Sequence, residues 1–285
     1  MVLPAQVMFF SILAFPLIAG AYLSLTSWSP LSGGGLKWFY AFKFWNGMNN
    51  YWDLIRDREF LMALARTFII VGVVVPVEFF LGLMISFLFM DKFPLKKVFH
   101  TLMIIPMMIV PAVGGFVFYM LFQAGGVING ILSFFTEEPV RIVWLQHQVL
   151  ALVTIMLADI WQWTPLMFLI LLSGLMSLPE DQMNAATILG FSKWQRFRMV
   201  VLPLMKPVFV IALIIRGIEA VKIFDPIWLM TAGGPGTVTE TISVYLYKHG
   251  FILLKWSWIA AAGLIVFALM NVIATFAFRP IREQM

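Results

Sequence analysis

Seven ionisable side chains stand inside stretches of the chain that are otherwise apolar, and these residues have the clearest potential for chemistry. They are Arg66, Glu78, Asp159, Arg216, Glu219, Lys222 and Asp225. An ionised side chain that faces lipid costs about 2.5 to 3.5 kcal/mol on insertion scales. Each of the seven is therefore expected to face a polar cavity or an opposite charge.

Two of these charges are placed so that they can interact along one helix. Arg216 and Glu219 are three residues apart and can pair on one helix face. Counted at about 1.5 Å of helical rise per residue, both fall near the middle of a membrane span. Asp159 falls at a similar depth in another span, and Asp225 lies towards the outer mouth. A structural ion pair and a contact with a ligand are equally good interpretations of Arg216 and Glu219.

The segment around Asp159 combines a carboxylate, an amide and two indole rings. Carbohydrate hydroxyls hydrogen-bond to carboxylate and amide groups, and the C–H face of a sugar packs on indole rings. The sequence therefore predicts a polar path that suits a carbohydrate. The residues assigned to this substrate path are Asp159, Trp161, Gln162, Trp163, Arg216, Glu219 and Asp225.

The sequence lacks the patterns of other catalytic and metal-binding sites. It contains no cysteine, and its three histidines are scattered singly, without metal-ligand spacing. No Gly-Lys dipeptide occurs, which excludes a P-loop for ATP phosphates, and no nucleophile–base pair stands out. The prediction is that this chain is not an enzyme and holds no cofactor or metal of its own.

Membrane-spanning helices must position these residues. Hydrophobic residues make up 62% of the 285 residues, charged residues make up 12%, and the mean hydropathy is +0.95. A soluble domain is roughly half apolar and a quarter charged, so a cytosolic enzyme, a disordered chain and a secreted module are excluded. A helix of about 20 apolar residues crosses a bilayer. We predict an all-α membrane protein with six transmembrane helices, the third interrupted by Pro106 and Pro111, over about 2–25, 61–90, 98–122, 149–172, 208–230 and 258–278.

The distribution of basic residues predicts the orientation of these spans. The loops on one side carry nine Lys or Arg residues and the loops on the other side carry seven. The side with more basic residues is assigned to the cytoplasm, and six spans then place both termini there. The net charge of +5 is explained by this topology, without nucleic acid as a partner.

The predicted cytoplasmic connection 177–207 has more internal pattern than a simple connector. It contains two possible capping boxes, which begin at Ser177 and Ser192, and Gly190 between them fits a helix C-terminus. Pro203 is predicted to end the second helix. The pattern predicts two short helices around a glycine, and an amphipathic helix lying on the membrane surface is the alternative.

This connection resembles the EAA loop of binding-protein-dependent ABC importer permeases. The matching residues are Ala185, Ala186, Gly190, Phe197, Leu202, Pro203 and Pro207. Asn184 stands where the family usually has Glu, and Leu189 where Asp is common. In that family the loop docks into a groove of the ATPase subunit. The resemblance therefore assigns the coupling to an ATPase to Asn184, Ala185, Ala186, Gly190, Leu202 and Pro203.

Two further segments are similar to the carbohydrate-uptake permeases of this class. The segment 224–241 contains Phe-Asp, Thr-Ala-Gly-Gly-Pro and Thr-Glu-Thr, and the segment 158–165 contains Trp-Gln-Trp-Thr-Pro. The first of these resembles the MalF-type subunit more than the MalG-type subunit. The resemblance extends over essentially all six spans, and it implies the six-helix architecture of type I (MetI-like) ABC importer permeases.

The resemblance also implies a complex in the cytoplasmic (inner) membrane of a bacterium or archaeon. Its other members would be a second, non-identical permease subunit, an ATPase dimer that holds ATP and Mg, and an extracytoplasmic solute-binding protein, with a carbohydrate as substrate. Two alternatives stay open. The cargo could be a polyol or an anionic sugar derivative, with Arg216 and Lys222 as its partners. Alternatively, the chain would be a secondary transporter with Glu78, Asp159 and Glu219 as a proton relay.

Overall fold

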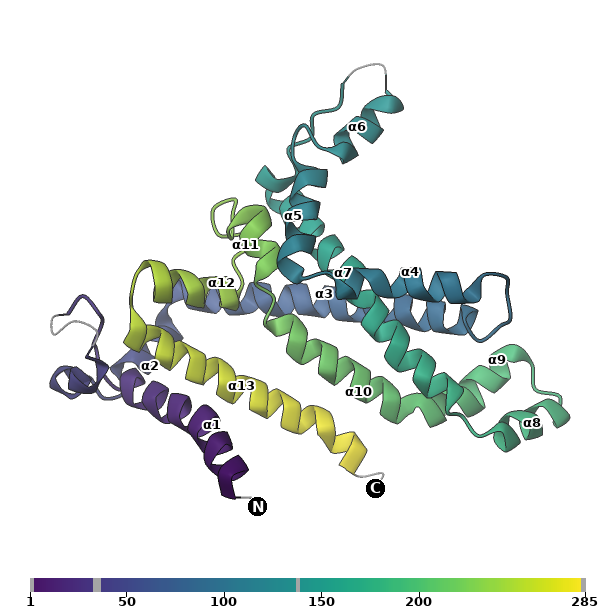
Figure 1. The fold of residues 1–285 in the computed structure, drawn as a ribbon, viewed down its shortest axis with the longest axis horizontal. Coiled ribbons are helices and arrows are strands. Elements are labelled where there is room, and N and C mark those ends of the chain that lie inside the picture. The colour runs from purple at the N-terminus through teal and green to yellow at the C-terminus, as the bar shows by residue number, and fades with distance from the viewer. Residues whose placement is uncertain (1–2, 33–36, 137–138, 283–285) are drawn as a thin grey trace. The chain divides into compact units, whose positions relative to one another are not determined.

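The computed structural model describes residues 3–32, 37–136 and 139–282, and their regular structure is helical apart from one isolated β-bridge (Figure 1). Six stretches of these residues are long and apolar enough to cross a membrane: Gln6–Ser24, Arg58–Leu88, Pro111–Phe134, Gln148–Met176, Lys193–Val221 and Trp256–Ala277. Within a bilayer a spanning segment must satisfy its own backbone groups, which a helix does. The predicted all-α fold with six transmembrane helices is confirmed.

Four of the six predicted spans correspond to single long helices. These are α1 (Leu3–Ser24), α3 (Arg58–Leu88), α7 (Gln148–Met176) and α13 (Trp256–Arg282). Residue 2, where the first span was predicted to begin, lies outside the described residues. Elsewhere the observed bounds differ from the predicted ones by a few residues: α7 and α13 extend past the predicted span at both ends, whereas α3 begins earlier and ends earlier.

The third predicted span is two helices, α4 (Lys96–Met108) and α5 (Pro111–Phe122). Of the two prolines expected to interrupt it, Pro106 lies inside α4 and Pro111 begins α5. A proline disfavours the helical conformation of the residue before it, and Val110 accordingly has an extended backbone with ψ of 132°. A short apolar helix, α6 (Val127–Phe134), follows α5.

The fifth span begins much earlier than predicted and continues from the connection 177–207. It consists of α9 (Lys193–Arg196), a π-helical turn η3 (Phe197–Val201) and α10 (Leu202–Val221), without interruption. The prediction that Pro203 ends a helix is therefore wrong. In the wider turn the Leu202 N–H bonds to the Phe197 carbonyl, five residues back, and the helix passes Pro203, which has no N–H to donate.

The same span ends earlier than predicted. After α10 the residues 222–224 are not helical, and α11 (Asp225–Thr231) follows. Pro226 cannot donate to the Lys222 carbonyl, and in a continuous helix its ring would clash with that carbonyl. The predicted span 208–230 is thus two helical segments with a break.

The chain divides into two compact units, and the first contains residues 1–65 and 241–275. It holds α1, η1 (Trp38–Phe44), α2 (Asn49–Arg56), the start of α3, α12 (Ile242–Tyr247), the π-helical turn η4 (Lys248–Ile252) and most of α13. Asn50 Nδ2 donates to the carbonyls of Ser24 and Thr26, at 2.7 and 2.6 Å. The Thr26 and Ser257 hydroxyls lie 2.8 Å apart. Buried hydrogen bonds therefore tie α13 to the end of α1.

The second unit contains residues 66–240 and the end of the chain. It holds most of α3, all of α4 to α11, the short η2 (Trp144–Gln146), α8 (Glu180–Ile188) and the turn η3. Phe89, Phe168 and Leu172 form an apolar cluster between α3 and α7, with Met103 of α4 packed against it. Both α4 and α10 pack on α7. Within this unit, α8 and α9 lie at one end and α6 lies beyond α5 at the other (Figure 1).

Candidate functional site

The connection 177–207 has a helix on each side of a glycine, and the first, α8, is the short helix predicted, whereas the second is the start of the long helix 193–221. Gly190 has a left-handed backbone with φ of +71°, the conformation that commonly ends a helix. Its N–H bonds to the Thr187 carbonyl and the Phe191 N–H bonds to the Ala186 carbonyl, each at 3.0 Å. These bonds satisfy the last carbonyls of α8, so the glycine acts as the helix stop.

Of the two predicted capping boxes, one is confirmed and one is wrong. Ser192 Oγ accepts from the Gln195 N–H at 3.3 Å, and Gln195 Oε1 accepts from the Ser192 N–H at 2.8 Å. At the start of α8 the N-cap residue is Pro179, without a side-chain cap. Ser177 instead donates to the Gly174 carbonyl at 2.8 Å, because the helix before it, α7, extends to Met176 and leaves its last carbonyls in need of donors.

The surface of this connection carries apolar side chains that nothing in the described chain covers. Ile188, Leu189 and Trp194 are 86%, 71% and 67% exposed. Of the residues assigned to coupling, Ala186 is buried and the others are exposed: Asn184, Ala185, Gly190, Leu202 and Pro203. An ordered element with exposed apolar tips has the properties of a docking surface.

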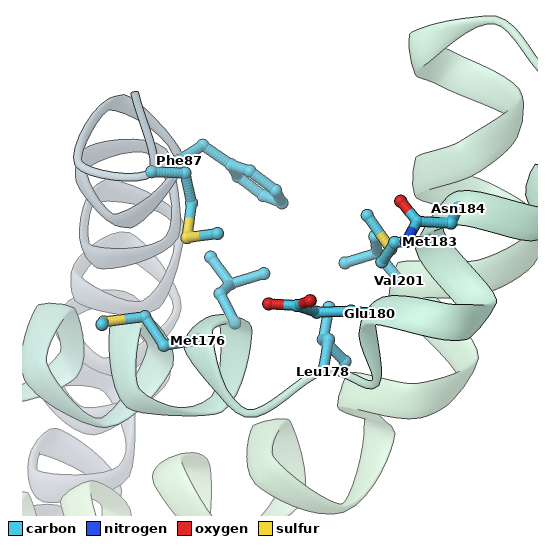
Figure 2. Close-up of a pocket in the computed structure, with 9 residues that line it drawn as sticks. Phe87, Met176, Leu178, Glu180, Met183, Asn184 and Val201 are labelled. Carbon is cyan, nitrogen blue, oxygen red and sulfur yellow. The ribbon is translucent and has the colours of Figure 1, made fainter. Parts of the chain in front are cut away.

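A pocket of about 400 Å³ separates α8 from the ends of α3 and α7. Its lining is mostly apolar and consists of Phe87, Met90, Leu175, Met176, Leu178, Glu180, Met183, Asn184 and Val201. Figure 2 shows the Glu180 carboxylate pointing into this space, with the Phe87 ring facing it from α3. Since α8 does not pack tightly on the ends of α3 and α7, there is room for α8 to move.

Five of the seven charges predicted inside the spans form two groups, and the first is a buried triad. Arg216 of α10 donates through Nε and Nη2 to the two oxygens of the Glu78 carboxylate, at 2.7 and 3.0 Å. Nη2 also donates to Oδ2 of Asp159. The side chains of Arg216, Glu78 and Asp159 are 1%, 0% and 3% exposed. The triad therefore joins α3, α7 and α10 inside the second unit.

Two neighbours of Asp159 on α7 are also occupied within the protein. The Arg216 guanidinium lies over the Trp163 ring, 5.3 Å from its centroid, and the ring is half-buried. Gln162 is buried, and its amide donates to the Ile109 carbonyl at 2.8 Å. Ile109 lies at the break between α4 and α5. Asp159, Gln162 and Arg216, predicted for the substrate path, are thus all inaccessible from the surface in this conformation.

The second group is an exposed pair, Glu219 and Lys222. Lys222 Nζ lies 2.7 Å from Glu219 Oε1, and the two side chains are 62% and 46% exposed, lysine first. The predicted pair of Arg216 with Glu219 does not form. Arg216 is buried and bonds to Glu78 and Asp159, so these acids of neighbouring helices compete with Glu219 for the arginine, and Glu219 stays exposed.

The remaining predicted path residues do not join the triad. Trp161 is exposed on α7 and packs against Phe118, with 5.4 Å between ring centroids. Asp225 is half-buried in the first turn of α11. Arg66, a charge in α3 that was not assigned to the path, donates through Nη2 to Thr237 Oγ1 at 3.0 Å and so ties α3 to the loop after α11. Within the described ranges, no group of three or more His, Cys, Asp or Glu could hold a metal ion.

Glu78 is the functional candidate that the path prediction omitted. A single acid in the long apolar helix α3 requires a partner, and this signal was available in the sequence. The sequence does not show which residue is the partner of Glu78, because Arg216 lies 138 residues away along the chain. Only the packing of α3 against α10 brings the two together.

Comparison with known proteins supplies a family. The model of the "Binding-protein-dependent transport system inner membrane component" family matches residues 55–282. A trehalose/maltose transport system permease protein, MalF, of Thermococcus litoralis is 34% identical over 71% of this chain and 68% of its own length. A sulfoquinovosyl glycerol transport system permease protein, SmoG, of Agrobacterium fabrum is 30% identical over 99% of this chain and 89% of its own.

A solved structure confirms the architecture. A bacterial ABC transporter involved in the import of the acidic polysaccharide alginate has a chain that matches with a TM-score of 0.80 and 20% identity, over 99% of this chain and 94% of that one. Another structure of the alginate transporter contains an alginate pentasaccharide-bound periplasmic protein. At this identity the likeness establishes the fold, the predicted architecture of an ABC importer permease.

Proposed function

Because the chain belongs to the family of inner membrane components of binding-protein-dependent transport systems, we propose that it forms half of the translocation path of an ATP-driven carbohydrate importer. As a member of that family it is a transport component, as predicted, and not an enzyme. ATP and Mg would be held by a separate ATPase dimer. The connection 177–207 would couple that ATPase to the spans.

The coupling role rests on one observation above all, the uninterrupted helix from Lys193 to Val221. Its first turn contains the exposed Trp194 and follows the exposed Leu189 by four residues, and its remainder is the fifth span. A push or pull on the connection would therefore act directly on the span. The pocket behind α8 supports this role, since it gives the docking helix space to shift.

The exposed pair Glu219 and Lys222 supports a place for this chain beside a second permease subunit. An ion pair that is half exposed at the break between α10 and α11 is costly if it faces lipid. Facing a polar cavity shared with a partner subunit removes that cost. We accordingly assign Glu219, Lys222 and Asp225 to the lining of the path, together with the accessible parts of Trp161 and Trp163.

The cargo class is supported by the relatives and by this lining. The relatives are named for trehalose/maltose and sulfoquinovosyl glycerol, and the structural neighbour for acidic alginate. Indole rings beside carboxylates suit sugar C–H faces and hydroxyls. Lys222 would favour an anionic sugar derivative, so neutral and acidic cargo remain the two candidates within the class. A polyol is a third, weaker one.

The transport cycle follows from these parts. ATP binding would close the ATPase dimer, move α8 and the helix 193–221, and open the path outward to a solute-binding protein. Hydrolysis would return it inward. ATP and the loaded binding protein thus bias two states of one helix bundle. In this topology both termini and the connection 177–207 would be cytoplasmic.

The experiment is ATP-dependent uptake by the complete complex in proteoliposomes. The cargo panel is trehalose, maltose, an alginate oligosaccharide and mannitol, each supplied with the binding protein that retains it. We expect uptake of one sugar that vanadate abolishes and an uncoupler leaves intact. The variant Leu189→Arg should lower uptake at least tenfold, because it places a charge at the docking surface.

Leu31→Arg is the matched control, since Leu31 is an equally exposed leucine outside the connection, and it should transport as the wild type does. Uptake that an uncoupler abolishes and vanadate leaves intact would establish the secondary transporter instead. Wild-type uptake and ATPase binding by Leu189→Arg would remove the coupling role from the connection and favour its membrane-lying alternative.

A further inference from the structure

The buried triad stabilises one geometry more than it stabilises the fold. Replacing a buried ion cluster by apolar residues of similar volume is often neutral or stabilising, because desolvation offsets the attraction. The two bonds from Arg216 to Glu78 constrain the relative orientation of the two side chains, since a bidentate guanidinium–carboxylate pair has one favourable alignment. The register of α10 against α3 is thereby specified at this point.

That point lies on the helix that begins at the docking connection. Arg216 is 23 residues after Lys193, or about 35 Å along a continuous helix at 1.5 Å per residue. Any displacement at the connection that moves this helix along or around its axis must break or distort the bonds to Glu78. The triad is therefore placed to oppose the movement that ATP binding would drive.

We infer that Glu78 is a positioning residue of the transport cycle, which holds helix 193–221 in its resting register and so restrains ATP hydrolysis until a loaded binding protein docks. This rests on the proposed function. Glu78 touches no cargo, because it is fully buried, and it acts through Arg216. A ligand shifts a conformational equilibrium only by the difference between its interactions with the two states. Glu78 would likewise favour the resting state, because it bonds to Arg216 more strongly in that state than in the other.

Trp163 gives the triad a connection to the path. One part of its ring lies over the Arg216 guanidinium and another part is accessible. A sugar that packs on the accessible part would therefore contact a ring whose position depends on Arg216. Release of the Glu78 contact would then accompany a change in the sugar-facing surface.

The test is Glu78→Gln in the complete complex, with ATPase rates measured without and with the loaded binding protein. We expect the rate without binding protein to rise on the order of five- to tenfold, near the lower end of the usual range of couplings between sites. Sugar transported per ATP hydrolysed should fall by a similar factor. The pair of Arg216 with Asp159 remains charge-balanced, so the variant keeps a partner for the buried arginine.

Glu59→Gln is the matched control, the same change at an exposed acid on the same helix, and it should leave both rates unchanged. Glu78→Asp keeps the charge with a shorter reach and should give an intermediate basal rate, and it serves if Glu78→Gln does not assemble. A structural role alone would lower yield and leave the ratio of sugar to ATP intact. Assembled variants with the wild-type basal rate and ratio would overturn the inference.

The outcome also separates this inference from the proposed function. If the wild-type complex shows no ATPase stimulation by any loaded binding protein, the proposed function fails before Glu78 is tested. If the wild type is stimulated normally and Glu78→Gln behaves like it, the importer stands and only the positioning role of Glu78 fails.

Discussion

Arg216 and Glu219 lie one helical turn apart on α10, and the structure gives them opposite surroundings. Arg216 is enclosed by two carboxylates and an indole ring, whereas Glu219 is half exposed and pairs with Lys222. In the sequence the two look like one ion pair. The difference shows that the cost of a charge in a span can be removed in two ways, by partners in the bundle or by a polar cavity.

The two clusters should therefore respond differently to mutation. A buried charge that loses its partner carries its full desolvation cost. An exposed charge that loses its partner is solvated instead, so that little stability is lost. Removing one charge from each cluster tests the comparison directly, and the expected effects on stability differ several-fold.

The largest effect is expected for Arg216→Gln, which leaves Glu78 and Asp159 buried side by side without a cation. We expect a loss of about 3 to 5 kcal/mol of stability, the usual result of breaking a buried ion pair. The measurement is the thermal midpoint of the complex in a fixed detergent, with the fraction of monodisperse complex. Arg56→Gln, at an exposed arginine of α2, is the control, and equal midpoints for the two variants would contradict a buried triad.

A smaller loss is expected for Asp159→Asn, because the bidentate pair of Glu78 with Arg216 remains. Losing one charge-assisted hydrogen bond costs about 1.5 to 3 kcal/mol. The same thermal measurement should place this variant between the wild type and Arg216→Gln. If Asp159→Asn is as unstable as Arg216→Gln, Asp159 and not Glu78 is the main partner of the guanidinium.

The smallest effect on stability is expected for Lys222→Gln, about 0 to 1 kcal/mol, as for other exposed pairs. Transport should respond more than stability, because Lys222 is assigned to the path. The ratio of alginate oligosaccharide uptake to trehalose uptake should fall. The double variant Glu219→Lys/Lys222→Glu keeps a pair of opposite charges and controls for stability. An unchanged ratio in both variants would remove the pair from the path.

Local chemistry explains which parts of the fold were predictable. The six apolar stretches, the stop at Gly190 and the capping box at Ser192 depend on neighbouring residues alone. The second box failed because α7 competes for Ser177. The prediction that Pro203 ends a helix was wrong because a wider turn before it keeps the helix continuous. That turn is a feature of the backbone before Pro203, and the identity of residue 203 does not reveal it.

The candidate site divides in the same way. Its residue types were recognisable, since an ionised side chain in an apolar run always requires an explanation. Which residues pair with which could not be recognised, because Glu78, Asp159 and Arg216 come from three helices. The hydrogen bond from Gln162 to the Ile109 carbonyl likewise depends on where α4 ends.

The sequence by itself determined that this protein lies in a membrane as six helical spans, that it contains no Gly-Lys dipeptide of a P-loop, and which of its few charges require partners. Composition and short motifs suffice for this, because the bilayer and the helix impose local rules. Only the tertiary structure decided that Arg216 is enclosed by Glu78 and Asp159 while Glu219 and Lys222 stay accessible. Burial and pairing are properties of helices packed together, and no single segment contains them.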